Sequence, residues 1–239
     1  MENSSKAMDG KLDLESFGPL ANILEGSLVQ LASTIRERVL QASTCNGELI
    51  ARIVGAYNLV HSIQLDGLKL VIRIPITGWG SGKTDTAVRA LESQVATMRV
   101  IARRTSIPVP EVYDFDSTDE NVIGAPYICM SFVSGTPVSQ VWFKEPDTRP
   151  REEMRHSILR SFSQVMTQFQ CFTFDKLVSI SGEKTSNPLA PCYDWHETDD
   201  DTVQIVSSGP FDSTSNYLAI HYKESRRNEW GIAESKILL

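Results

Sequence analysis

Three features are scarce in this sequence of 239 residues: clustered cysteines, an excess of positive charge and long apolar runs. The cysteines stand far apart, with no CxxC pair and no histidine at ligand spacing, so they predict reduced thiols: Cys45, Cys129, Cys171 and Cys192. A net charge of -7 argues against a general surface for nucleic acid or anionic membranes. No run approaches the roughly 18 apolar residues of a membrane helix, and the acidic start lacks the apolar region of a signal peptide. We therefore expect a soluble, cytoplasmic protein that binds neither nucleic acid nor membrane.

Hydrophobic residues make up 41% of the chain, which is enough to build sizeable cores. Three short β-prone runs follow one another between Ala51 and Pro75: residues 51–54, 59–65 and 69–75. The turn signals Gly55-Ala56-Tyr57-Asn58 and Asp66-Gly67 separate them. A two-residue Asp-Gly between β-prone runs is a strong hairpin signal, so the sequence predicts consecutive antiparallel strands.

The first of these turns and a cation in the third run are candidate ligands for an anion. Gly55 and Asn58 tolerate positive φ, so the turn that also holds Ala56 and Tyr57 could present bare backbone N–H groups to a phosphate. Arg73 lies inside an otherwise apolar run, and a buried guanidinium needs a partner.

A candidate partner for this guanidinium follows in residues 90–101. Apolar residues recur there at helical spacing, at Leu91, Val95 and Met98, and Glu92 lies beside that stripe. A glycine turn, a strand cation and a helix glutamate come in this order in the nucleotide lobe of protein kinases. In that lobe the cation contacts phosphates and the glutamate holds the cation.

Three more motifs follow in order: Ile107-Pro108-Val109-Pro110-Glu111-Val112-Tyr113, Gly124-Ala125-Pro126-Tyr127-Ile128-Cys129-Met130 and Ser134-Gly135. With them, residues 50–143 resemble the amino-terminal lobe of the kinase-like aminoglycoside phosphotransferase family. Arg73 stands where the family usually has lysine, as in a fungal-type branch of it. The resemblance implies an α+β, protein-kinase-like fold, with an antiparallel-sheet N-lobe and a mostly helical C-lobe.

The resemblance also implies an ATP-binding cleft. Phosphates would lie at Gly55, Ala56, Tyr57, Asn58, Arg73 and Glu92. The carbonyl of Ser131 and the N–H of Val133 would contact adenine, with Met130 lining the pocket. An alternative role for Met130 is plain core packing.

Three segments follow from these observations. Residues 1–18 are polar and expected to be disordered, and residues 19–133 form the N-lobe with a leading helix over 20–42. Residues 134–239 hold the hinge and an incomplete C-lobe. Within the C-lobe we expect a helix at 152–172, a loop at 179–202 and a helix from Ser213 to about Trp230.

The residues that perform phosphoryl transfer have no counterpart in the sequence. Kinase-like enzymes use H-[RGP]-D-x-x-x-x-N after the hinge, followed by a later Asp. None of the four histidines fits: His61, His156, His196 and His221. In the one match by spacing, Lys223 takes the place of the base. No catalytic residue is predicted and Mg²⁺ is not expected, so the chain reads as a kinase-like domain cut before its catalytic loop, with an undefined acceptor.

Two alternatives stay open. Gly82-Lys83-Thr84 could end a P-loop, although Thr77 occupies the position of its first glycine. A non-enzymatic, pseudokinase-type interaction module could have kept the fold alone, with Arg73 and Glu92 as a structural ion pair.

Overall fold

In the computed structural model of this protein, the described residues are 14–43, 46–143, 150–181, 189–198 and 202–220. The first half contains α-helices, strands and short 3-10 helices (η) in the order η1 (Leu14–Asn22), α1 (Glu25–Leu40), β1 (Gly47–Val54), β2 (Asn58–Leu65), β3 (Leu68–Pro75), η2 (Gly80–Gly82), α2 (Asp85–Arg104), β4 (Val112–Asp116) and β5 (Tyr127–Ser131). The second half contains α3 (Val138–Val141), α4 (Arg151–Thr167), η3 (Gln168–Cys171), β6 (Ser179–Ile180), β7 (Leu189–Ala190), β8 (Cys192–Glu197) and β9 (Val203–Ser208).

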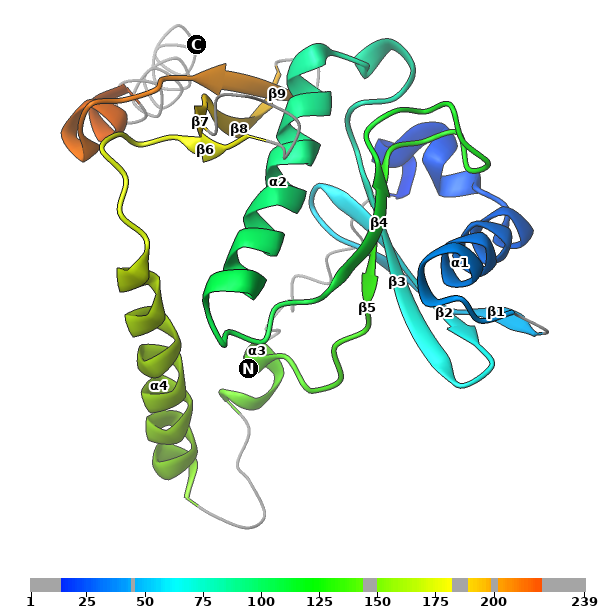
Figure 1. Cartoon of the computed structure of the whole chain (residues 1–239), viewed down its shortest axis with the longest axis horizontal. Coiled ribbons are helices and arrows are strands. Elements are labelled where there is room, and N and C mark those ends of the chain that lie inside the picture. The colour runs from blue at the N-terminus through cyan, green and yellow to red at the C-terminus, as the bar shows by residue number, and fades with distance from the viewer. Residues whose placement is uncertain (1–13, 44–45, 144–149, 182–188, 199–201, 221–239) are drawn as a thin grey trace, which may run out of the picture.

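Five strands form one antiparallel sheet in the order β1-β2-β3-β5-β4 (Figure 1). The predicted Asp-Gly hairpin is confirmed, because Asp66 (φ 40°) and Gly67 (φ 87°) both have the positive φ that a tight two-residue turn requires. Leu65 pairs with Leu68 across this turn. The sheet and its helices confirm the predicted α+β class.

Each face of the sheet carries its own hydrophobic core. On one face, α1 and η1 cover a large cluster that includes Phe17, Leu28, Ile35, Ile63, Ile72 and Ile74. On the other face, α2 covers a smaller cluster of Leu91, Val95, Ile128 and Met130. Successive residues of a strand point to opposite faces, so Arg73 points to the side of α2.

The amino-terminal boundary differs from the prediction. Residues 14–18 belong to η1 and Phe17 is 1% exposed, so the expected disorder does not extend to residue 18. The leading helix begins later than predicted, at Glu25, because Leu24 before it is extended (φ -65°, ψ 137°).

The loop predicted at residues 179–202 is wrong where the structure describes this range, and residues 182–188 and 199–201 lie outside the described residues. β6 pairs with β7, and β8 pairs with β9. Prolines and acidic residues indicated a loop, but β8 extends to Glu197, and beyond it the Thr198 N–H donates to the Thr202 carbonyl (2.8 Å). α2 contacts β4 on one side and β6 and β9 on the other, so it lies between the large sheet and the smaller strands (Figure 1).

The other helices of the second half are close to the predicted ones. The helix expected at 152–172 is present as α4 and η3. The last predicted helix is observed over residues 214–220, and its continuation to Trp230 lies outside the described residues. None of the helices within the described ranges combines the length and apolar composition needed to cross a lipid bilayer.

Candidate functional site

Arg73 is held by a neutral amide. Its Nη2 donates to Oε1 of Gln94 on α2. Burial lowers the pKa of Arg73, because a guanidinium removed from water loses hydration that favours its charged form. No carboxylate among the described residues forms an ion pair with it. The charge of Arg73 is therefore partly buried and not neutralised by this part of the protein.

The predicted pair of Arg73 with Glu92 is wrong. Glu92 and Gln94 are two residues apart on α2, which separates their side chains by about 200° around the helix. The Glu92 carboxylate instead accepts a weak hydrogen bond from the Ser117 hydroxyl (3.5 Å). Gln94 is three residues from the buried Leu91, so helical spacing pointed to it. The sequence pattern therefore placed residue 94 on the correct face of α2, but a neutral amide and not a carboxylate is the partner of Arg73.

Arg73 lines a pocket of about 460 Å³ between the large sheet and the smaller strands. Asn58 lies there with it, so the structure brings these two predicted residues together. The rest of the lining comes from α2, β6 and β8: Ala90, Ser93, Gln94, Thr97, Met98, Ser179, Tyr193 and Trp195. Arg73 carries the one formal charge of this lining at neutral pH, and we call the cavity the Arg73 pocket.

The glycine turn has another geometry than the one predicted. The Gly55 N–H donates to the Asn58 carbonyl (2.9 Å), so it closes the turn and is not bare. Gly55, Asn58 and the exposed Ala56 between them have no positive φ. The Tyr57 ring stacks on Trp195 of β8, with centroids 4.9 Å apart and planes 5° apart. The turn thus packs against β8 through this pair of rings.

The predicted hinge residues lie outside the Arg73 pocket. Met130 is 7% exposed and packs in the α2 cluster, so its side chain contributes to the core. The Ser131 N–H donates to the Glu111 carbonyl (2.9 Å), and the Ser131 hydroxyl accepts from the Glu111 N–H (2.9 Å). Val133 is 58% exposed. Met130, Ser131 and Val133 therefore do not contribute to the lining of the Arg73 pocket.

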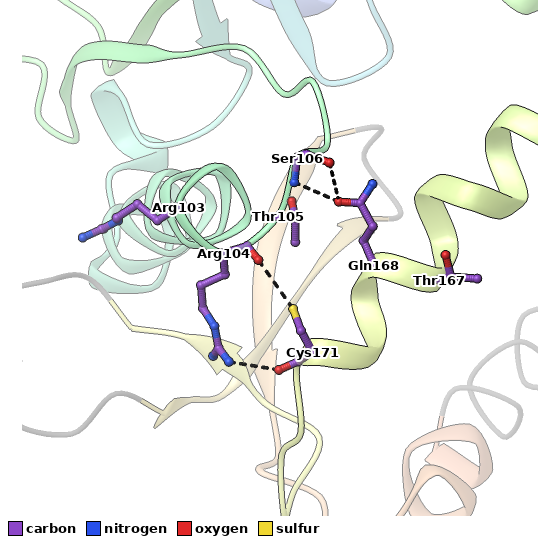
Figure 2. Close-up of a pocket in the computed structure, with 7 residues that line it drawn as sticks. All are labelled: Arg103, Arg104, Thr105, Ser106, Thr167, Gln168 and Cys171. Carbon is purple, nitrogen blue, oxygen red and sulfur yellow. Dashed lines mark hydrogen bonds between the residues drawn. The ribbon is translucent and has the colours of Figure 1, made fainter.

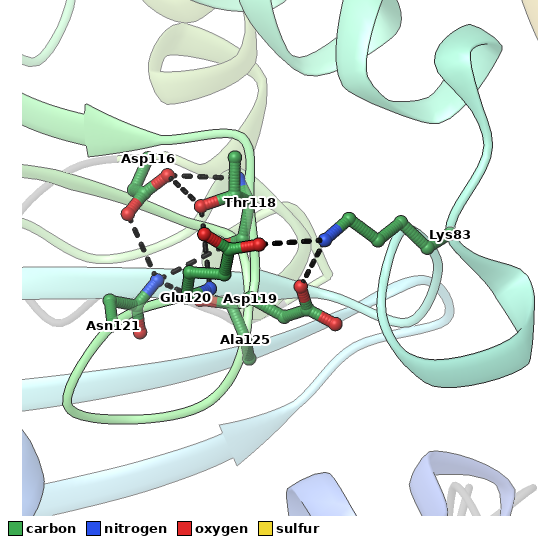
Figure 3. A network of polar contacts seen from close by, with 7 residues as sticks. All are labelled: Lys83, Asp116, Thr118, Asp119, Glu120, Asn121 and Ala125. Atoms are coloured by element: carbon green, nitrogen blue, oxygen red, sulfur yellow. Dashed lines mark hydrogen bonds and ion pairs between the residues drawn. The ribbon is translucent and has the colours of Figure 1, made fainter.

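Lys83 takes part in a surface network that joins two loops (Figure 3). Its Nζ lies 2.5 Å from Asp119 Oδ1 and 3.9 Å from Glu120 Oε1. The hydrogen bond with Asp119 raises the pKa of Lys83. Thr84, the next residue, caps α2 by accepting from the Ala87 N–H (3.1 Å). The segment proposed as a P-loop connects an antiparallel strand to α2, and its lysine is paired with carboxylates.

A second hollow lies where the end of α2 meets η3 (Figure 2). The Ser106 N–H and hydroxyl both donate to Gln168 Oε1 (2.8 and 2.9 Å), and Arg104 donates to the Cys171 carbonyl (2.9 Å). These polar groups thus form hydrogen bonds with one another. The contacts join the first half of the chain to the second, which is a structural role.

Two further possibilities for chemistry find no support. His61 is fully buried on the α1 face, and burial together with the Arg52 charge lowers its pKa to about 4. It therefore stays neutral and away from the Arg73 pocket. Within the described ranges, no three His, Cys, Asp or Glu side chains gather as a metal site would require.

Comparison with known proteins gives a consistent result. A family model, described as the phosphotransferase enzyme family APH, matches residues 27–200. Altered inheritance of mitochondria protein 9 of Candida tropicalis is 27% identical over 184 residues, which are 76% of this chain and 26% of that protein. The protein of the same name from Clavispora lusitaniae is 24% identical over 241 residues, or 99% of this chain and 36% of that protein. A subtelomeric hrmA-associated cluster protein of Aspergillus fumigatus is 36% identical over 89 residues, or 37% of this chain and 16% of that protein.

These matches confirm the family resemblance and its fungal character, and they correct one expectation. The chain spans between 16% and 36% of the length of these relatives. The altered inheritance proteins are named as mitochondrial, which contradicts the cytoplasmic location expected from the sequence.

Proposed function

We propose, on the premise that this chain belongs to the APH phosphotransferase enzyme family, that the Arg73 pocket binds the phosphate tail of a nucleotide such as ATP. One observation carries the proposal. The guanidinium of Arg73 is partly buried, it donates to the neutral amide of Gln94, and it borders an open cavity. An anion that enters the pocket supplies the missing negative charge.

The lining of the pocket supports a phosphate-bearing ligand. Electrostatic attraction is stronger at a partly buried site than in water, and guanidinium–phosphate hydrogen bonds are among the strong ones. The hydroxyls of Ser93 and Thr97 and the amide of Asn58 could donate to further phosphate oxygens. Contacts of the base with Ser131 and Val133 stay a prediction of the family resemblance.

We propose further that the residues of this chain bind a nucleotide without transferring its phosphoryl group. Transfer needs a group that orients the acceptor hydroxyl and ligands that hold Mg²⁺. The sequence of 239 residues contains no H-x-D-x-x-x-x-N motif to supply them. Binding should therefore depend little on Mg²⁺, and incubation with ATP should release no phosphate.

Isothermal titration calorimetry with ATP, with and without Mg²⁺, tests this function. Arg73→Gln should weaken ATP binding by at least about tenfold, the order expected for losing one charged hydrogen bond. Lys83→Gln is the matched control, because it removes a cation that is paired on the surface. Circular dichroism should show that both variants are folded.

Two outcomes would contradict the proposal. If Lys83→Gln abolished binding while Arg73→Gln did not, the P-loop alternative would be correct. If the folded wild-type chain bound neither ATP nor ADP, the domain would be an interaction module that keeps only the fold.

A further inference from the structure

A serine with two arginines before it follows the end of α2. Arg103 and Arg104 are the last residues of the helix, and Thr105 and Ser106 come directly after them. Both arginines and Ser106 are exposed. Protein kinases choose their substrates partly by charge pattern, and those with an acidic substrate-binding surface select arginines two and three residues before the serine. The segment presents this pattern at the surface of the protein.

The structure distinguishes Ser106 from the hydroxyl next to it. The Thr105 hydroxyl donates to the Ile101 carbonyl (2.7 Å), so it caps the end of α2, and its side chain is half-buried. Ser106 lines the hollow of about 540 Å³ between α2 and η3, together with Arg103 and Arg104 (Figure 2). Of the two neighbouring hydroxyls, Ser106 is therefore the one that a second protein can reach.

Ser106 also holds one of two contacts that join α2 to η3. Its hydroxyl and its N–H both donate to Oε1 of Gln168, the first residue of η3 (2.9 and 2.8 Å). Beside it, the Arg104 guanidinium donates to the Cys171 carbonyl (2.9 Å). η3 continues directly from α4, and α4 contributes no buried residue of its own. The position of α4 relative to α2 therefore depends on contacts at this end.

A phosphate on Ser106 would remove the first contact and compete for the second. A serine hydroxyl has a proton to donate, whereas an ionised phosphate monoester carries only acceptor oxygens. Those oxygens would meet Gln168 Oε1, which is itself an acceptor. The Arg104 guanidinium forms stronger hydrogen bonds with a phosphate than with a neutral carbonyl, so it would leave Cys171.

We propose that Ser106 is a phosphorylation site for a separate serine/threonine protein kinase that selects basic sequences, and that the phosphate opens the contact between α2 and η3. In the transfer, a bond forms between Ser106 Oγ and the γ-phosphorus of ATP, and the bond from that phosphorus to the bridging oxygen breaks. ADP leaves with the electron pair, and the hydroxyl proton passes to the catalytic carboxylate of the kinase. The inference does not rest on nucleotide binding at Arg73, so the two proposals fail separately.

Incubation of the folded chain with cAMP-dependent protein kinase and ATP tests the site. Peptide mass spectrometry should find a phosphate on Ser106 and none on Thr105. Ser106→Ala should abolish incorporation into this segment. Arg103→Gln should slow it at least about tenfold, the order expected for losing one charge-assisted contact with the kinase. Circular dichroism should show that both variants are folded.

Hydrogen exchange measured by mass spectrometry tests the opening of the contact. Phosphorylation should raise the exchange rates of the η3 amides about tenfold, the order expected for losing two hydrogen bonds. Gln168→Ala removes one contact without a phosphate, so it should raise the same rates, and phosphorylation should add less in this variant than in the wild type. Gln164→Ala is the matched control, because this exposed glutamine precedes η3 and does not line the hollow. It should leave the rates within about twofold.

Two results would overturn the inference. If the kinase modified Thr105, or left Ser106 unmodified in the folded wild-type chain, Ser106 would not be the site. If Ser106 were phosphorylated while the η3 amides exchanged at an unchanged rate, the phosphate would not open the contact with α2.

Discussion

Replacing Gln94 by Glu tests whether the unneutralised charge of Arg73 is what makes the pocket attractive to anions. The Gln94 amide oxygen already accepts from the Arg73 guanidinium, so Gln94→Glu exchanges an amide for a carboxylate of the same shape. Two unit charges about 4 Å apart attract by about 4 kcal/mol at an effective dielectric constant of about 20. Desolvation of the carboxylate offsets much of this attraction, and we expect a net stabilisation of about 1–2 kcal/mol.

The variant should therefore change stability and binding in opposite directions. The new ion pair should raise the thermal unfolding midpoint by about 2–8 °C for a chain of this size. It should weaken ATP binding about 5- to 30-fold, because the phosphates then meet a neutralised pair. Differential scanning calorimetry and ATP titration measure the two effects.

Glu92→Gln is the matched control for this experiment. It changes one charge on the same helix, but Glu92 contacts Ser117 and not Arg73. ATP affinity should stay within about twofold, because the half-buried Glu92 side chain is hydrogen-bonded to Ser117 and does not line the Arg73 pocket. If Gln94→Glu left ATP binding unchanged or strengthened it, the charge argument for the pocket would be refuted.

Two further predictions concern the folded sheet. His61 is buried and its pKa is lowered to about 4, so the unfolded chain binds a proton below about pH 6.5 that the folded chain refuses. The free energy of unfolding should therefore fall by about 3 kcal/mol as pH drops from 6.5 to 4. Urea unfolding of His61→Leu should show a smaller loss over that interval. If the variant lost as much stability as the wild type, the pH dependence would not come from His61. Gly67 has φ 87°, so Gly67→Ala should destabilise by about 1 kcal/mol. Gly82→Ala, whose added Cβ meets open space, should be neutral in the same urea titration.

The local features of the sheet could be read from short stretches of sequence. Asp66-Gly67 predicted the β2–β3 hairpin because its two residues favour the positive φ that the turn requires. Arg73 was predicted to be a cation inside an otherwise apolar, buried strand, because the residues on either side of it in the run are apolar. These predictions depend on interactions within a few residues of one another.

The partners of these residues could not be read in the same way. The rotation of α2 against the sheet decides whether residue 92 or 94 meets Arg73, and packing of Leu91 and Val95 sets that rotation. The contribution of β8 to the pocket was missed because prolines and acidic residues predicted a loop where the structure has a short hairpin, which contacts α2 and Tyr57.

The sequence alone thus determined the family, the order of the strands along the chain and the presence of a buried guanidinium, because motifs, turns and residue alternation are local properties. Only the tertiary structure decided that a neutral amide holds this guanidinium and that β8 borders its pocket. Both depend on the packing of segments that lie far apart in the chain, and such packing is set by the whole core.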